Sequence, residues 1–189
     1  EVVIHDESGK LDLNVADPAL IARLLQEFGP SPEEAAALAA AIVDWRDPDG
    51  FVGPAGGAEA REYRAAGLPW GPANRAFASV EEVQRVLGMR HGLYRALRPQ
   101  LTVHTGLPQP NLAFADRPLL LALGLPPDQV EELLAVRASL RADLPPPVLP
   151  GGLVLAVAGT GTYSISSRAA RADGPEAELH ATLRVGAGG

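Results

Sequence analysis

The sequence predicts an α+β fold in which one β-sheet takes strands from both ends of the chain and carries a helical insertion between them. Apolar and polar residues alternate in residues 11–14 and 176–185, and Val2 and Ile4 alternate with Val3 and His5, as in strands with two different faces. From residue 17 to residue 97 the apolar residues instead recur every three or four positions, as in amphipathic helices. We therefore expect a sheet domain of residues 1–15 and 101–189 and an all-helical inserted domain of residues 16–100.

The composition of the 189-residue chain is globular, with 47% apolar and 21% charged residues. The formal net charge of −7 argues against a nucleic-acid partner, because phosphate binding needs clustered lysine and arginine. Since cysteine is absent, disulfides and cysteine-based zinc sites are excluded. No apolar run reaches the length of about eighteen residues that spans a bilayer. The chain starts inside a strand pattern and without methionine, so we interpret it as a soluble fragment or a processed form.

Capping residues mark the first two helices. Asp17 followed by Pro18 begins a helix that ends at Gly29. Ser31 and Glu34 have the spacing of a capping box, in which the serine side chain and the glutamate side chain each bond a backbone N–H at the helix start. The second helix should therefore extend from this box to the acidic stretch described below.

Two short strands around a turn are expected in residues 1–14, and further strands at 153–158, 163–171 and 176–185. A second capping box, of Ser79 and Glu82, should begin a helix that ends at Gly88, and further helices are expected at 91–97, 119–123 and 127–140. Residues 99–105 should be extended, and residues 142–152 should form a linker. The last two strands should form a hairpin with one buried face. A loose internal repeat relates residues 13–18 to residues 110–118, and each copy leads into a leucine-rich helix.

The most unusual stretch is acidic and covers residues 44–63. Asp44, Asp47 and Asp49 fall within six residues, and a glycine-rich loop then leads to Glu59. A proline and a glycine beside the aspartates favour a turn. Carboxylates held close together repel one another unless water or a hard cation such as Ca²⁺ screens them. A solvated acidic turn and a cation site are therefore both open on the residues alone.

The acidic stretch is not an EF-hand. That loop needs a glycine at its sixth position and a glutamate at its twelfth. Counting from Asp47, those positions hold Val52 and Ala58.

Histidines and aromatic residues offer no further site. His5, His91, His104 and His180 lie far apart and are expected on strands or at the surface. The aromatic residues of the helical block are expected in its core: Trp45, Tyr63, Trp70, Phe77 and Tyr94.

Three motifs in the helical block resemble those of a known family. They are residues 44–49, Asp-Trp-Arg-Asp-Pro-Asp; residues 57–63, Gly-Ala-Glu-Ala-Arg-Glu-Tyr; and residues 72–83, Pro-Ala-Asn-Arg-Ala-Phe-Ala-Ser-Val-Glu-Glu-Val. Their order and spacing are similar to those of the K-type minor pseudopilin of bacterial type II secretion systems (GspK), with Val83 where that family often has leucine. Residues 6–14 also resemble the family's first motif, with Asp12 in place of asparagine. At residues 110–118 the chain departs from the family pattern, so only a helix-capping function is expected there.

The resemblance implies a pilin-like antiparallel sheet interrupted by a helical domain, and an N-terminal hydrophobic helix, absent from this chain, that anchors the protein in the inner membrane. It implies a structural protein at the tip of the periplasmic pseudopilus of a Gram-negative type envelope, which helps to start assembly and export across the outer membrane. The implied partners are the I-type and J-type minor pseudopilins, with secreted substrates as further partners. It also implies Ca²⁺, for which Asp44, Asp47, Asp49 and Glu59 are the expected ligands and Asn74 a more remote candidate.

Catalysis and nucleic-acid binding fit the residues less well than this structural function. For an enzyme, the carboxylates near Asp47 and Glu59 are the available acid–base groups, and no histidine or lysine lies near them in sequence, so we expect no catalysis. For a nucleic-acid module, the short helices around Gly29 and Gly88 resemble helix-hairpin-helix units. Their neighbouring loops are acidic, which disfavours phosphate binding.

Overall fold

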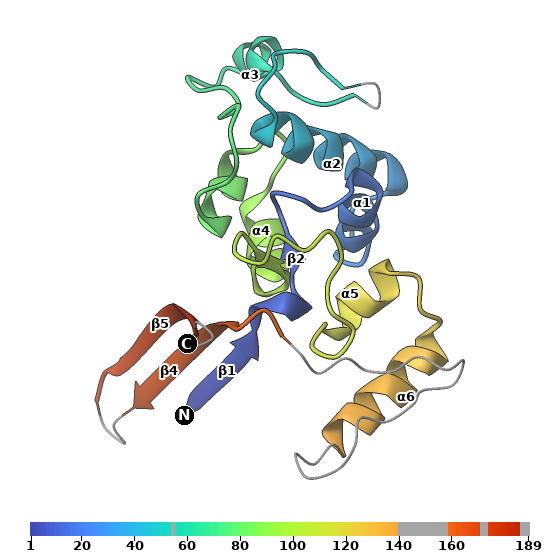
Figure 1. Cartoon of the computed structure of the whole chain (residues 1–189). Helices are drawn as coiled ribbons and strands as arrows, with labels where there is room; N and C mark the ends of the chain where they lie inside the picture. Colours follow the sequence, from blue (N-terminus) through green and yellow to red (C-terminus); the bar gives the residue numbers. More distant parts are fainter. Residues whose placement is uncertain (54–55, 140–158, 171–173, 186–189) are drawn as a thin grey trace.

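The computed structural model describes residues 1–53, 56–139, 159–170 and 174–185. A body of short helices occupies most of these residues, and a three-stranded sheet lies to one side of it (Figure 1). The expected linker at 142–152 and the expected strand at 153–158 lie outside the described residues.

Both ends of the chain contribute to the sheet, as predicted. Strand β1 (Val2–Asp6) pairs antiparallel with β4 (Thr162–Ala170), which pairs antiparallel with β5 (Glu176–Arg184), in the order β1-β4-β5. A separate parallel pair is formed by the short strands β2 (Leu11–Asp12) and β3 (Leu101–Thr102). The N-terminal segment therefore connects the two sheets.

The prediction of a buried face on the last hairpin is wrong for β5. All nine residues of this strand are exposed, and Leu179 is 69% and Leu183 52% accessible. The helices bury their apolar surface against one another, and none of the described elements covers the apolar side chains of β5.

The helices of the body follow in chain order: η1 (Glu7–Gly9), α1 (Pro18–Gln26), α2 (Pro32–Arg46), α3 (Ala60–Ala65), η2 (Val80–Arg85), α4 (His91–Leu97), η3 (Arg98–Gln100), α5 (Arg117–Ala122) and α6 (Pro127–Ala138). The predicted starts of α1 and α2 are confirmed. The Asp17 side chain accepts the Ala19 N–H at 2.8 Å, and Ser31 and Glu34 form both bonds of the capping box.

Two local predictions differ from the structure. Ser79 makes no capping bond, and the segment after it is the 3₁₀ helix η2, in which Glu82 accepts the Ala78 N–H at 3.1 Å instead. Helix α3 was not predicted, because it has only six residues and buries only Tyr63, which is too little to give a helical period.

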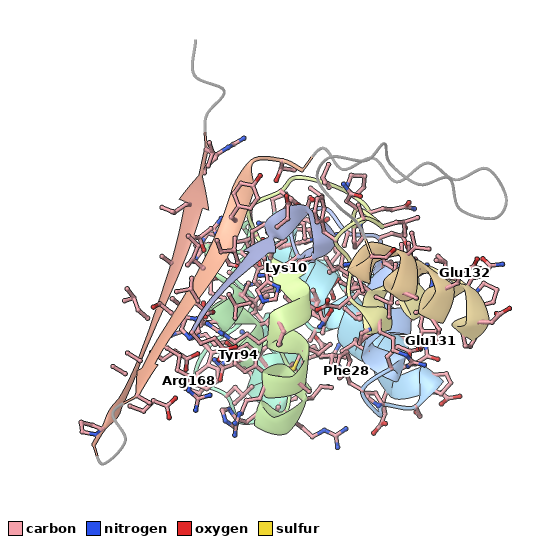
Figure 2. All side chains as sticks on the ribbon, turned by 90° about the horizontal axis from the view of Figure 1, so that it is seen from below. Lys10, Phe28, Tyr94, Glu131, Glu132 and Arg168 are labelled. Carbon is pink, nitrogen blue, oxygen red and sulfur yellow. The ribbon has the colours of Figure 1, made fainter. Side chains whose placement is uncertain are left out.

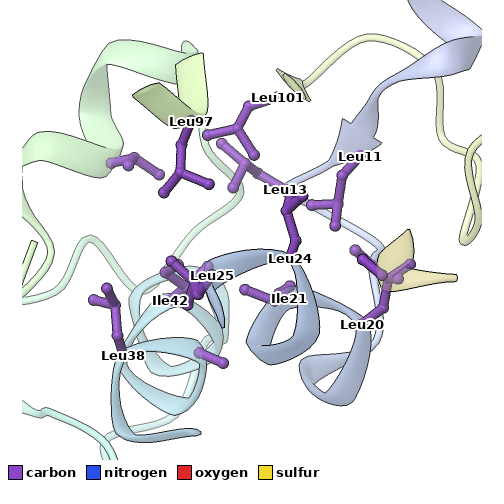
Figure 3. Close-up of a cluster of buried hydrophobic side chains, with 14 of the residues drawn as sticks. Leu11, Leu13, Leu20, Ile21, Leu24, Leu25, Leu38, Ile42, Leu97 and Leu101 are labelled. Atoms are coloured by element: carbon purple, nitrogen blue, oxygen red, sulfur yellow. The ribbon is translucent and has the colours of Figure 1, made fainter. Parts of the chain in front are cut away.

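A single hydrophobic cluster forms the core of the body. It includes leucines from α1, α2 and the β2–β3 region, with Leu24 and Leu25 almost fully buried (Figure 3). Leu119 and Leu120 of α5 and Leu133 of α6 belong to the same cluster. The helices that follow residue 100 therefore share a core with the helices before it, while the domain boundaries at residues 15 and 100 stay predictions.

A buried polar link joins the sheet to the body. Glu7 is 3% exposed; Lys10 pairs with its Oε1, and the Thr102 hydroxyl donates to its Oε2. The Lys10 ammonium also donates to Ser164 Oγ of β4 at 2.9 Å. Burial alone would raise the pKa of Glu7, but the bonds from Lys10 and Thr102 outweigh it and lower the pKa below its ordinary value.

Close packing next to this link leads to a testable expectation at Gly9. A Cβ at this position would lie 2.4 Å from the backbone carbonyl of Phe114, so the backbone would have to shift. Gly9→Ala should lower the free energy of unfolding by about 1–3 kcal/mol in urea denaturation.

The matched control is Gly92→Ala. Gly92 lies inside α4 and its Cβ would meet nothing within 4 Å, so the alanine should leave stability unchanged or raise it by up to ~1 kcal/mol through helix propensity. Equal stabilities for the two variants would contradict the packing at Gly9.

Candidate metal centre

The acidic loop begins where α2 ends. Asp47 is the C-cap of α2 and has extended backbone angles, and Pro48 after it has no N–H with which to continue the helix. The Asp49 side chain then accepts the Phe51 N–H at 2.8 Å, which closes a local turn. The loop returns at Glu59, the N-cap of α3. The two helices thus hold the two ends of the loop, which lies at the edge of the body in Figure 1.

Three of the four expected ligands converge. One carboxylate oxygen each from Asp47, Asp49 and Glu59 lies within 4.8 Å of the other two. Oxygens that share one Ca²⁺ at about 2.3–2.6 Å from the ion lie at most about 5 Å apart, so this spacing fits a common ion.

Two buried oxygens in this group have no hydrogen-bond partner. They are Asp47 Oδ1 and Glu59 Oε1, and Glu59 is only 5% exposed. An unpaired buried acceptor costs free energy, and for a charged group the cost is larger. The residues present therefore fit a hard cation with oxygen ligands.

Asp44 is placed differently from the other three carboxylates. It is almost fully buried, and its Oδ2 accepts the Ala58 N–H at 2.9 Å, while the Gly53 N–H bonds the same carboxylate. A Cβ at Gly57 would lie 2.0 Å from Asp44 Oδ2, so the loop approaches the carboxylate too closely for any larger residue. Asp44 therefore holds the two sides of the loop together, and its function as a ligand stays a prediction.

Asn74 supports the loop from outside. Its side-chain Nδ2 donates to the Asp49 carbonyl at 2.8 Å, and its own backbone is left-handed with φ 49°. Asparagine adopts this region more readily than most residues. The contact orients the backbone next to one candidate ligand.

In the folded chain, the surroundings of the loop's carboxyl groups disfavour their ionised form. Burial, together with repulsion from neighbouring carboxylates, raises the pKa of Asp44, Asp47 and Glu59 above their ordinary values. A divalent cation would remove both the repulsion and the desolvation cost. The loop is thus electrostatically strained without a counter-charge.

Aromatic side chains form the support beneath the loop. Trp45 lies 6.3 Å from Tyr63 and 6.0 Å from Phe77 between ring centroids, and all three are buried. The Tyr63 hydroxyl accepts the Leu87 N–H at 3.0 Å, and burial raises the pKa of Tyr63 to about 12. The Phe77 backbone exchanges two bonds with the Asn14 side chain, at 2.7 and 3.1 Å.

The prediction that the aromatic residues form the core is confirmed for Trp45, Tyr63, Phe77 and Tyr94, whereas Trp70 is 44% exposed. Sequence reasoning missed Glu62, whose carboxylate accepts the Glu59 N–H at 3.1 Å and completes the cap of α3. The spacing of Glu59 and Glu62 is that of a capping box, although glutamate is an unusual first residue for one.

The raised pKa values predict how stability depends on pH in metal-depleted buffer. Between the unfolded and the folded pKa, the folded state binds more protons than the unfolded state, so the free energy of unfolding should fall as pH rises from about 4 towards 7. Glu7 acts in the opposite sense: its stabilisation is present above its unfolded pKa and is lost as pH falls through its folded pKa. Glu59→Gln should flatten the fall towards neutral pH in urea denaturation.

Glu132→Gln serves as the control for this pH series, because Glu132 is exposed on α6 (Figure 2), and α6 lies far from the loop between α2 and α3 (Figure 1). This variant should keep the wild-type pH profile. A wild-type profile for Glu59→Gln as well would show that the raised pKa of Glu59 has no energetic consequence.

Comparison with known proteins connects this fold and site to one family. Residues 5–109, more than half of the chain, match the family model described as type II secretion system (T2SS), protein K. This range includes the whole candidate centre and the body as far as β3.

One curated relative and one solved structure agree with this match. The type II secretion system protein K of Pectobacterium carotovorum subsp. carotovorum is 36% identical over 83 residues, which are 43% of this chain and 25% of that protein. The chain thus spans about a quarter of that relative's length in the match.

The structural match is to one chain in the crystal structure of the GspK-GspI-GspJ complex from the enterotoxigenic Escherichia coli type 2 secretion system. It has a TM-score of 0.67 and 21% identity and covers 98% of this chain and 74% of that one. At this identity the match shows the fold, and it confirms the predicted α+β, pilin-like class. With the family match over residues 5–109, it follows that this chain belongs to the type II secretion system protein K family.

Proposed function

We propose that this chain is the structural part of a K-type minor pseudopilin, which sits at the tip of the type II secretion pseudopilus and helps to start its assembly. The family match over residues 5–109 carries this proposal. The fold supports it, because 98% of the chain aligns with a chain of a GspK-GspI-GspJ complex, including the sheet outside the family match. I-type and J-type minor pseudopilins are accordingly the proposed partners, and secreted substrates pass the complex during export.

The proposed location is the periplasm. No helix among the described residues has the length and apolarity needed to cross a bilayer. Attachment to the inner membrane and export across the outer membrane are parts of the same proposal, and they rest on family membership.

The nucleic-acid alternative is not favoured. Gly88 follows the 3₁₀ helix η2, so the segment around it is not a pair of α-helices. Gly29 does lie between two α-helices, but Glu27 and Glu33 flank it, and their charge would repel phosphate. We propose that the carboxylate loop has a structural function: it would stabilise a protein that serves as a scaffold in the secretion system.

Ca²⁺ is the proposed ion of the centre, with Asp47, Asp49 and Glu59 as ligands and Asp44 as the residue that closes the loop. The two unpaired oxygens of Asp47 and Glu59 support this assignment. The ion would supply the positive charge that the loop lacks, and would thereby fix the loop between α2 and α3 against the aromatic core.

Calcium should raise the thermal stability of the chain. An ion that binds only the native state adds about 2.7 kcal/mol at a hundredfold excess over Kd, so the melting midpoint should rise with Ca²⁺ and return with EDTA. Glu59→Gln and Asp47→Asn should abolish most of this rise, whereas Glu132→Gln should keep it. Identical midpoints with Ca²⁺ and with EDTA would remove the metal from the proposal.

The partner assignment is tested by co-purification. A tagged chain expressed with the soluble parts of the I-type and J-type minor pseudopilins should elute with both in one complex. A tagged, unrelated periplasmic protein is the control for non-specific retention. Elution of this chain alone, while the I-type and J-type proteins pair with each other, would contradict the proposed assembly.

A further inference from the structure

Strand β5 is the outer strand of the three-stranded sheet. It is the last in the order β1-β4-β5, and all nine of its residues are exposed. In Figure 2 it is the strand farthest from the helical body. None of the described residues pairs with its outer edge. Exposed edges of this length are usually shortened, charged or covered, because their free N–H and C=O groups template pairing with another strand.

The outward backbone groups of β5 can be assigned from its pairing with β4. The Val185 N–H donates to the Gly161 carbonyl at 2.7 Å, in register with the pairing of Thr162 with Arg184. In an antiparallel ladder the hydrogen-bonded pairs alternate, so the odd-numbered residues of β5 bond to β4. The even-numbered residues, from Glu178 to Arg184, therefore direct their backbone groups to the open edge.

The side chains of β5 are complementary to those of a second β5 in antiparallel orientation. With the two-fold axis at Ala181, Leu179 of each copy lies opposite Leu183 of the other on one face. On the other face, Glu178 lies opposite Arg184. Each of these pairs occurs twice because of the symmetry, and no like charges face each other.

We propose that the open edge of β5 binds β5 of a second copy of this chain, antiparallel and centred on Ala181, to form a continuous six-stranded sheet. Any other strand would need a cation opposite Glu178, an anion opposite Arg184 and large apolar residues between them. This chain carries all of these at the required spacing. The inference concerns self-association and is independent of the proposed function.

Inside its own sheet, Glu178 is also opposite Arg168 of β4, and its carboxylate lies 3.4 Å from His180 Nε2. The Glu178 carboxylate is thus already held on the polar face of the sheet. This position leaves it next to the edge where Arg184 of a second copy would arrive.

A cysteine at the axis tests the geometry directly, because the natural chain has no cysteine. Ala181 would face itself in a non-hydrogen-bonded pair, with a Cα–Cα distance of about 4.5 Å, which lies within the range for disulfides. Ala181→Cys should give a disulfide-linked dimer under mild oxidation. Val2→Cys is the control, since Val2 is 63% exposed on β1, the opposite edge of the same sheet, and should stay monomeric.

A charge exchange tests the pairing without a covalent bond. Glu178→Arg and Arg184→Glu should each raise the dimer dissociation constant about tenfold in sedimentation velocity, because two attractive pairs become repulsive. The double variant Glu178→Arg/Arg184→Glu should bind about tenfold more tightly than Glu178→Arg alone, because both variants lose the pairing of Glu178 with Arg168 but the double variant regains the attraction across the axis. Glu132→Arg on α6 should leave the affinity unchanged. A wild-type chain that stays monomeric at all concentrations, a double variant no tighter than Glu178→Arg, or cross-linking at Val2 equal to that at Ala181 would each overturn the proposal.

Discussion

The ion pair between the buried Glu7 and the half-buried Lys10 determines how the sheet is attached to the rest of the molecule. Burying two charges costs free energy, and the attraction between them offsets it only when the remaining hydrogen-bonding groups are also satisfied. Here the Thr102 hydroxyl donates a hydrogen bond to the Glu7 carboxylate, and Ser164 Oγ accepts one from the Lys10 ammonium. These partners come from β3 and β4, so one polar cluster joins segments that are 95 and 154 residues apart in sequence.

The helical body is stabilised in a different way. Its helices pack around one continuous apolar core and not around an ion pair. Helices from the first and from the second half of the chain bury their leucines in the same cluster. The end of α2 extends from this core and carries both Trp45, which packs inward, and the aspartates, which face the loop. A rigid core thus presents a group of mutually repelling carboxylates. This combination is suited to an ion that completes the local structure and does not require a substrate pocket.

The evidence for the fold extends over more of the chain than the evidence for the family. The family model ends at residue 109, soon after β3, whereas the structural match extends over nearly the whole chain. The structural match therefore covers the sheet strands β4 and β5, which lie after the residues of the family match. All nine residues of β5 are exposed, and at such positions packing constrains the residue types least.

Much of the fold followed from the sequence, because capping residues and apolar periodicity act over a few positions. Asp17, Ser31 and Glu34 define the first helices through bonds to backbone groups within three residues, so tertiary contacts are not needed to predict them. The same reasoning failed at Ser79, where the local pattern fits an α-helix but the chain forms a 3₁₀ turn.

In the acidic loop, the order of the residues predicts one part of the arrangement and folding sets the other. The residues alone placed four carboxylates near one turn, because their spacing along the chain is short. Only the folded chain separates Asp44, which holds the loop through the Ala58 N–H, from Asp47, Asp49 and Glu59, whose oxygens converge. Whether a carboxylate bonds to the backbone or lies beside the other carboxylates depends on how far the loop folds back on α2. Packing between segments sets this distance, and the order of the residues does not.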